Sequence, residues 1–199
     1  MPRLFTEKKL VIATHNKGKL AEFRALLSPL GIEVTSAGEL GLPDPEETGT
    51  SFAENALIKA RAACDASGLP ALGDDSGLCV AALGGAPGIH SARWCGDARD
   101  PAVGVARIQE GLGDSKDFTA SFFCSLALVW PDGAVEAVEG ECTGQLVFPP
   151  RWSLGHGYDP WFQPDGEART FGEMVQDEKE ALSHRGVAMR KLLALFVRP

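Results

Sequence analysis

Carboxylate side chains of the kind that bind a divalent cation occur at two places in this sequence. Glu46 and Glu47 lie in a segment rich in Gly, Pro, Asp and Glu (37–50), and Asp74 and Asp75 lie in the stretch GDDSG. Adjacent carboxylates in apolar sequence are costly unless they bind a cation or accept hydrogen bonds. Hard oxygen ligands with no His or Cys nearby suit Mg²⁺. The alternatives are surface charge for the Glu pair and an Asx-capped turn for the Asp pair, and the apolar flanks of the Asp pair weaken the second alternative.

Basic residues that could hold phosphate occur in other parts of the sequence. The stretch THNKGK follows an apolar run and precedes a helical pattern, so its backbone N–H groups and Lys19 could form an anion site. Lys59 lies one turn after Asn55 on another predicted helix and faces the same way. For the THNKGK turn taken alone, the plainer alternative of a solvated turn with a helix N-cap is favoured.

Two further clusters could recognise a nucleobase. GHGYDP (155–160) offers an aromatic ring and a carboxylate in a backbone held by Gly and Pro. SHRG (183–186), with Lys179 before it, offers donors that suit the 6-oxo group of a purine or a phosphate. The 6-amino group of adenine is itself a donor, so it could not accept a hydrogen bond from these side chains. The alternatives are a structural aromatic turn and the solvated first turn of the last helix.

The composition excludes several classes of protein. The chain has 199 residues and a net charge of -8, which disfavours a binder of nucleic-acid polymers. Its five cysteines are far apart with no C-x-x-C, so neither a disulfide framework nor a zinc site is indicated. The sequence shows no apolar signal core and no run long enough to span a bilayer, and it contains no P-loop, H-E-x-x-H, complete G-x-G-x-x-G or G-x-S-x-G motif. We therefore expect a soluble cytoplasmic protein of one domain.

The elements that must position these residues follow a β-loop-α-β opening, which indicates an α/β protein. Expected strands cover 9–13, 33–36, 118–130 and 134–142, the last two joined by a Pro-Asp-Gly hairpin turn. Expected helices cover 19–30, 51–67 and 101–111, with a capping box from Ser51 to Glu54, and a last helix that starts at Asp177 or Ser183. The stretch 71–80 reads as apolar and acidic, interrupted at two glycines, while 37–50, 83–93 and 146–164 read as loops.

Taken together, the clusters suit a nucleoside triphosphate, and the sequence strongly resembles the inosine-triphosphate pyrophosphatase family. The matching stretches are ATHNKGKLAEFRALL, EETGTSFAENALIKARAA, GDDSGLCVAALGGAPGIHSARW, GHGYDPWF and FGEM with EKEALSHRGVAMRKL. They cover most of the chain in the order of the family. The resemblance implies an enzyme that hydrolyses dITP, ITP and XTP to the monophosphate and pyrophosphate and so removes them from the nucleotide pool.

The resemblance also implies the roles of individual residues. Asp75 is the carboxylate assigned as general base, and Glu47 and Asp75, with Asp74 beside them, would bind Mg²⁺, for which Mn²⁺ could substitute. Ser76 would contact the substrate. Thr14, Asn16 and Lys19 would hold the phosphates with Lys59 nearby, and the candidate substrate-binding residues are Thr14, His15, Asn16, Lys17, Gly18, Lys19, Lys59, Ser76, His156, Gly157, Tyr158, Asp159, Lys179, His184 and Arg185.

The fold implied by the resemblance is α/β, a long, curved, mixed β-sheet flanked by helices, with two lobes and a central cleft, all within one domain (1–199). Homodimers are usual in the family. The family usually has Phe at the place of His156, and a His ring stacks with less apolar area and can carry charge, which bears on base affinity and its pH dependence. Two rivals are a non-catalytic nucleotide-binding module, which the intact carboxylates disfavour, and a pyrophosphatase for pyrimidine or modified nucleotides, which SHRG and GYD disfavour.

Overall fold

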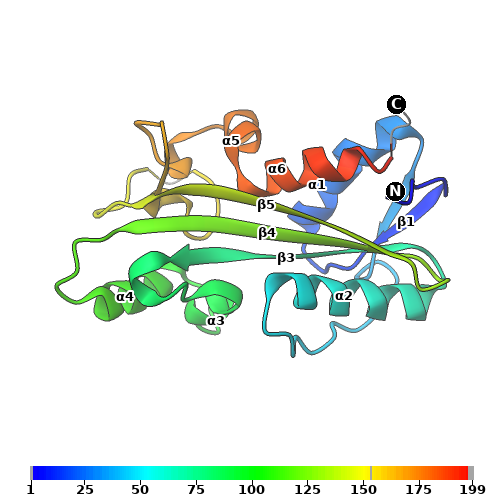
Figure 1. The fold of residues 1–199 in the computed structure, drawn as a ribbon, viewed down its shortest axis with the longest axis horizontal. Helices are drawn as coiled ribbons and strands as arrows, with labels where there is room; N and C mark the ends of the chain where they lie inside the picture. Colours follow the sequence, from blue (N-terminus) through cyan, green and yellow to red (C-terminus); the bar gives the residue numbers. More distant parts are fainter. Residues whose placement is uncertain (1, 153, 197–199) are drawn as a thin grey trace. The chain divides into compact units, whose positions relative to one another are not determined.

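Within the residues that the computed structural model describes (2–152 and 154–196), six strands form one mixed sheet in the order β2-β1-β3-β4-β5-β6 (Figure 1). β1 runs parallel to both β2 and β3, and β5 runs antiparallel to β6. The strands are β1 (Lys9–Ile12), β2 (Glu33–Ser36), β3 (Ala71–Val80), β4 (Thr119–Val129), β5 (Val135–Leu146) and β6 (Phe162–Pro164). The expected α/β class with a mixed sheet is thereby confirmed.

The α-helices lie between these strands and after the last of them. They are α1 (Lys17–Leu27), α2 (Phe52–Ser67), α3 (Ser91–Trp94), α4 (Pro101–Leu112), α5 (Gln176–Leu182) and α6 (His184–Leu193). Among the described residues, none of these helices has both the length and the apolar character that crossing a bilayer requires.

The chain divides into two compact units, in keeping with the two lobes that the family resemblance implies. The first unit comprises Met1–Asp75, Ser125–Glu139 and Ala188–Pro199, and the second comprises Ser76–Cys124 and Gly140–Val187. The chain passes from one unit to the other within β3, β4, β5 and α6.

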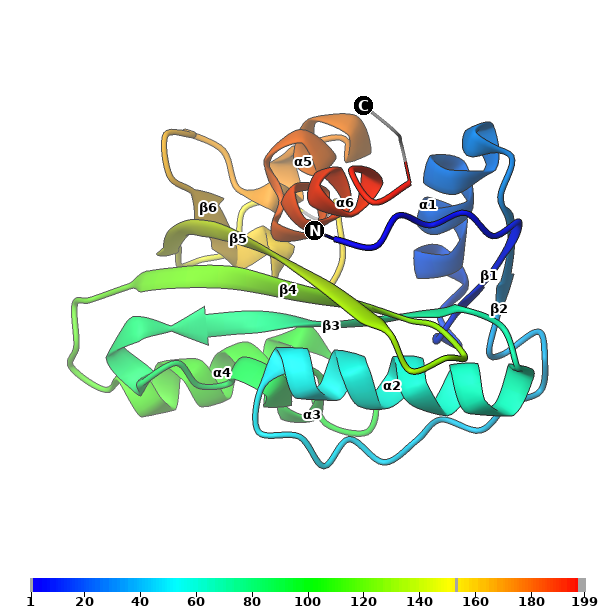
Figure 2. The same ribbon diagram turned by 45° about the vertical axis from the view of Figure 1, so that its right-hand side comes forward.

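In the first unit, helix α2 lies along β3 (Figure 2), and small side chains are buried between them. Ala56, Ala60 and Ala63 are buried together with Val11 of β1. The approach is closest at Gly73, where an added Cβ would lie 2.0 Å from the carbonyl oxygen of Ala56. Because no side chain separates helix from strand at this point, polar residues on α2 reach the side chains of β3.

The first two helices begin where side chains cap them. The Asn16 Oδ1 accepts hydrogen bonds from the backbone N–H groups of Gly18 and Lys19, so α1 starts two residues earlier than expected. Ser51 Oγ accepts from the Glu54 N–H as expected of a capping box. The Glu54 carboxylate accepts from the Thr50 N–H at 2.6 Å, and its contact with the Ser51 N–H also lowers the Glu54 pKa, so the reciprocal contact of the expected box is present beside the one to Thr50.

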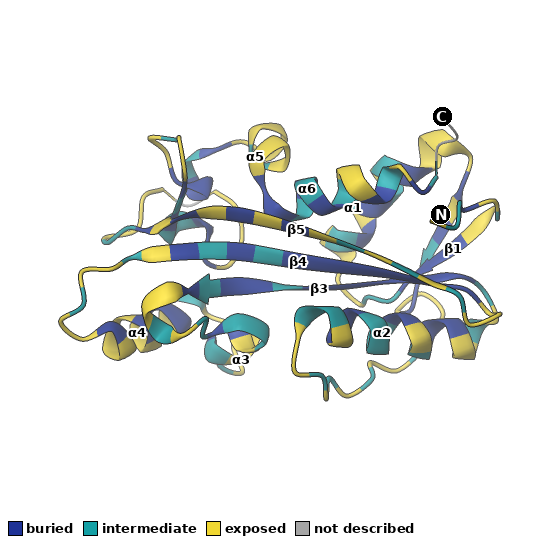
Figure 3. Ribbon diagram, viewed as in Figure 1, coloured by how far each residue is buried: buried dark blue, intermediate teal, exposed yellow. Residues whose placement is uncertain are grey.

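The segment 71–80 forms one continuous strand, so the expected interruption at its glycines is wrong. β3 is buried along almost its whole length (Figure 3). The glycines therefore mark close packing rather than a break. In the second unit the core is aromatic, and Phe122, Phe162 and Phe171 pack together with ring centroids 4.7 to 6.1 Å apart.

Two expected loops contain more structure than their composition suggests. The glycine-rich stretch 83–93 includes the 3-10 turn Gly88–His90 and the first part of α3. The stretch 146–164, of which Ser153 lies outside the described residues, ends in β6. Both expected starts of the last helix are close to real ones, because Ser183, in extended conformation, separates α5 from α6.

Candidate active site

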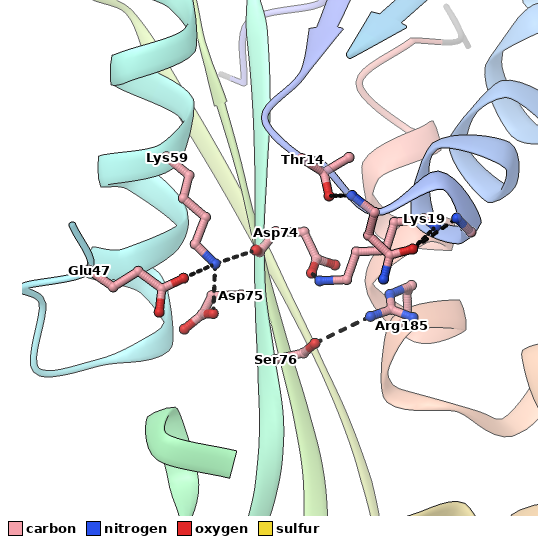
Figure 4. A network of polar contacts seen from close by, with 10 residues as sticks. Thr14, Lys19, Glu47, Lys59, Asp74, Asp75, Ser76 and Arg185 are labelled. Carbon is pink, nitrogen blue, oxygen red and sulfur yellow. Dashed lines mark hydrogen bonds and ion pairs between the residues drawn. The ribbon is translucent and has the colours of Figure 1, made fainter. Parts of the chain in front are cut away.

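The two neighbouring carboxylates of β3 point to opposite faces of the strand (Figure 4). Asp74 forms an ion pair with Lys19 of α1, whereas Asp75 Oδ1 lies 2.9 Å from the Nζ of Lys59 of α2. Successive side chains of a strand alternate between its faces, and this alternation separates the pair. We expected Asp74 and Asp75 to lie together at one metal site. In the structure, Asp74 faces Lys19 and Asp75 faces Lys59.

On the α2 face, Lys59 gathers three oxygen acceptors (Figure 4). Its Nζ lies 2.7 Å from the Glu47 carboxylate, 2.9 Å from Asp75 Oδ1 and 3.0 Å from the backbone carbonyl oxygen of Asp74. The loop residue Glu47 and the strand residue Asp75 thus meet at one ammonium group. Glu46, which the sequence alone could not separate from Glu47, is exposed.

Burial and charge shift the proton affinities of this cluster. Burial raises the pKa of Asp75 by more than the Lys59 ammonium lowers it, and the nearby Glu47 charge adds to the rise. Burial alone would lower the pKa of Lys59, but the charge of Asp75 and contacts with Glu47 outweigh it and raise that pKa. Lys59 therefore stays charged, while Asp75 is a stronger base than an exposed aspartate.

Asn55 belongs to this cluster although it was not among the predicted site residues. It is buried, its Oδ1 accepts a hydrogen bond of 2.9 Å from the Gly49 N–H, and its side chain faces Asp75 closely enough to lower the pKa of that carboxyl. A polar side chain on the apolar, alanine-rich face of a predicted helix is the signal that could have identified it. Asn55 thereby connects the loop that carries Glu47 to the strand that carries Asp75.

The predicted phosphate turn contains an N-cap, which was the plainer alternative. Asn16 holds the N–H groups of Gly18 and Lys19, and Thr14 Oγ1 accepts from the Asn16 N–H at 3.1 Å. These two helix N–H groups are therefore already bonded, and Lys17 and Gly18 are exposed. The cation that the turn supplies is Lys19, held by Asp74.

Side chains of the GHGYD loop mostly face the protein. Tyr158 is buried, and its hydroxyl donates to the Ser91 carbonyl oxygen at 2.8 Å, so its ring is not a free surface for a nucleobase. Asp159 is also buried; its Oδ2 lies 2.5 Å from Lys179 Nζ and accepts from the His156 N–H at 2.6 Å. The exposed residues of the loop are Gly155, His156 and Gly157.

The SHRG segment lies at the start of α6. The His184 ring is buried and stacks on Phe122, with centroids 4.8 Å apart and planes inclined by 12°. Arg185 is half-buried, and its Nη2 lies 3.3 Å from the Ser76 hydroxyl (Figure 4). Within the second unit, the structure thus places Ser76, the residue after Asp75, beside the guanidinium group expected to read the base.

Comparison with known proteins gives the family of the chain. A family model described as the Ham1 family matches residues 10–195. A dITP/XTP pyrophosphatase of Gluconobacter oxydans is 54% identical over 97% of this chain and 93% of its own length, and one of Rhodopseudomonas palustris is 55% identical over 96% and 93%.

Solved structures agree with this assignment. The Ham1 protein of Staphylococcus aureus superposes with a TM-score of 0.88 at 34% identity, covering 94% of this chain and 97% of that one. A HAM1 protein from Coxiella burnetii gives a TM-score of 0.88 at 42% identity, covering 94% and 96%. On sequence and structure together, the chain belongs to the Ham1 family.

Proposed function

We propose that this protein is a Mg²⁺-dependent pyrophosphatase that hydrolyses abnormal purine nucleoside triphosphates (dITP, ITP and XTP) to the monophosphate and pyrophosphate. The observation that carries the proposal is the convergence of Glu47, Asp75 and Lys59 at one point of the first unit. Relatives at 54% and 55% identity that are named dITP/XTP pyrophosphatase support the substrate class. The same relatives support the general activity, that of a nucleoside-triphosphate pyrophosphatase.

The donor set fits a magnesium ion that the protein holds only in part. Asp75 Oδ2 is buried and accepts no hydrogen bond of normal geometry from the described residues, which leaves an oxygen for a cation. Among those residues no three His, Cys, Asp or Glu side chains cluster as a complete metal site, and Asp74 faces the other way. Mg²⁺ is commonly bound by one or two carboxylates plus water and substrate phosphates. Glu47 and Asp75 are therefore the residues that would hold it, with Mn²⁺ as a substitute.

When bound, Mg²⁺ would supply neutralisation of the charge that develops on the phosphates. Asp75 orients the attacking water and accepts its proton, a role that suits a carboxylate whose pKa is raised by burial. Lys59 keeps Glu47 and Asp75 close together and adds positive charge beside the phosphates. Lys19 lies on the other face of β3, beside Asp74, and is the second ammonium group proposed to bind phosphate.

The test is a panel of nucleoside triphosphates assayed with and without Mg²⁺. Pyrophosphate is expected from ITP, dITP and XTP, far less from ATP and GTP, and none after removal of divalent cations with EDTA. Restoring Mg²⁺ or Mn²⁺ should restore the activity. Release of inorganic phosphate in place of pyrophosphate would show that a different bond is cleaved, and equal rates on all nucleotides would remove the proposed selectivity.

Replacing Arg185 by Ala is expected to raise KM for ITP and to narrow the preference for ITP over ATP by roughly ten- to a hundredfold. Loss of a charged donor to a 6-oxo group is worth about 1.5–3 kcal/mol, whereas adenine offers that donor no acceptor. The ratio of kcat/KM for the two nucleotides measures the effect. Arg190→Ala is the matched control, because Arg190 is exposed further along α6. An unchanged ratio in Arg185→Ala would remove this residue from base recognition.

We also carry forward two expectations from the family resemblance. The protein is proposed to act in the cytoplasm and to form a homodimer. Light scattering coupled to size-exclusion chromatography measures the second directly, and a mass of one chain at micromolar concentration would contradict it.

A further inference from the structure

Glu47 lies in a segment that has no regular secondary structure of its own. Residues 42–49 are neither helix nor strand, and several of them are exposed. Such a segment loses conformational entropy when it is ordered, so its position depends on contacts at its two ends. The C-terminal end is fastened to α2, because the N–H groups of Gly49 and Thr50 donate to the Asn55 and Glu54 side chains at 2.9 and 2.6 Å.

The N-terminal end is fastened by His15. The Nε2 of its ring lies 2.8 Å from the Leu42 carbonyl oxygen, and the Nδ1 lies 2.6 Å from Asp44 Oδ1. The ring also lies close to Gly38, where an added Cβ would be 3.3 Å from the His15 Cδ2. Both ring nitrogens therefore face acceptors of the segment, and each contact is a hydrogen bond when that nitrogen carries hydrogen. The prediction that His15 binds substrate remains a prediction.

Side chains leave unfilled space beside residues 42–45 of the segment. A small cavity lies beneath it, lined by Leu42, Pro43 and Pro45 on one side and by Lys59 and Ala63 on the other. The space between this part of the segment and α2 is therefore not completely filled. The contacts of His15 with Leu42 and Asp44, called the polar clamp below, fix residues 42–44.

We propose that His15 is a positioning residue that fixes the Glu47 segment to the turn between β1 and α1. The clamp holds residues 42–44, Asn55 holds Gly49, and Glu47 between them is kept at its contact with Lys59. Losing the clamp should make the segment more mobile, whatever the protein does. It should also lower the affinity for Mg²⁺, and this second expectation rests on the proposed function.

The mobility of the segment is tested by hydrogen exchange of the free protein. The N–H groups of Leu42, Gly49 and Thr50 are hydrogen-bonded at the two ends of the segment. In His15→Ala these three amides are expected to exchange roughly fivefold faster, the effect of two lost surface contacts. The His15 side chain is 38% exposed, so the variant is expected to fold. The matched control is Arg24→Ala, which removes a similarly exposed ion pair with Glu39 upstream of the segment and should leave the exchange of the same three amides unchanged. Unchanged exchange in His15→Ala would overturn the proposal.

Kinetics then separate positioning from direct substrate contact. In His15→Ala the Mg²⁺ concentration for half-maximal rate is expected to rise roughly fivefold, with kcat at saturating Mg²⁺ nearly retained. Asp44→Ala should change the same quantity in the same direction, and the double variant should be little worse than His15→Ala, because both act on one clamp. A raised KM for ITP with unchanged Mg²⁺ dependence would instead assign the ring to the substrate. If wild-type protein releases no pyrophosphate, the proposed function fails while the exchange result still tests the clamp.

Discussion

Replacing Asp75 by Asn is expected to lower kcat for ITP by about 10³ or more. The change keeps the size of the side chain but removes the proton acceptor and half of the paired carboxylate charge, and general-base catalysis alone contributes roughly 10²–10⁴. Asp75 also supplies the buried oxygen that suits a cation. The Mg²⁺ concentration for half-maximal rate should therefore rise in the variant. Pyrophosphate release at saturating ITP and Mg²⁺ measures the loss.

Asp65→Asn is the control for this prediction, because Asp65 is exposed on α2. It removes the same charge from the same unit and should retain the wild-type rate. The melting temperature of Asp75→Asn should stay close to that of the wild type, because Glu47 still pairs with Lys59. An Asp75→Asn variant within tenfold of wild-type activity would contradict the assigned role.

Replacing Gly73 by Ala is expected to destabilise the protein by about 3 kcal/mol or more, at the upper end of overpacking effects. The new methyl group would lie 2.0 Å from the Ala56 carbonyl oxygen and 2.9 Å from the Ala60 nitrogen, and both are backbone atoms that cannot rotate away. α2 must move outward, and Lys59 and Asn55 move with it. Urea denaturation should show the loss of stability, and activity should fall in the fraction that stays folded.

Gly111→Ala provides the opposite case. In α4 the added Cβ would meet the Cδ2 of Leu83 at 3.0 Å, which is the end of a flexible side chain. Alanine is a better helix former than glycine by about 1 kcal/mol, so this variant should be neutral or slightly more stable. Equal denaturation midpoints for the two variants would show that the contact between α2 and β3 is looser than described.

How much of the fold was predictable depends on the range of the signal. The helix over 52–67 was predicted because its cap and its small-residue face are local patterns. The continuity of β3 was not, because a glycine within a strand marks either a break or a close approach, and only the position of α2 decides between them. The split of the last helix at Ser183 likewise follows from the extended conformation of that residue, which the sequence does not indicate.

The candidate site divides in the same way. Glu47, Lys59 and Asp75 were predicted to belong to one site, and the structure brings these three into contact. The use of His15 and Tyr158 was not predictable, because their partners at Asp44 and Ser91 are distant in sequence and offer no motif. The separation of Asp74 from Asp75 was within reach, since alternation along a strand requires it once 71–80 is recognised as one strand.

The alternation of β3 makes its length in residues as critical as its chemistry. Deleting or inserting one residue just before Asp74 would exchange the two carboxylates between the sheet faces, unless the register of the whole strand moved to compensate. Lys59 would then lose its buried partner and Lys19 would meet the wrong neighbour, although the composition of the site would be unaltered. Point substitutions therefore test single contacts, whereas an insertion or deletion in this strand would change the contacts on both of its faces at once.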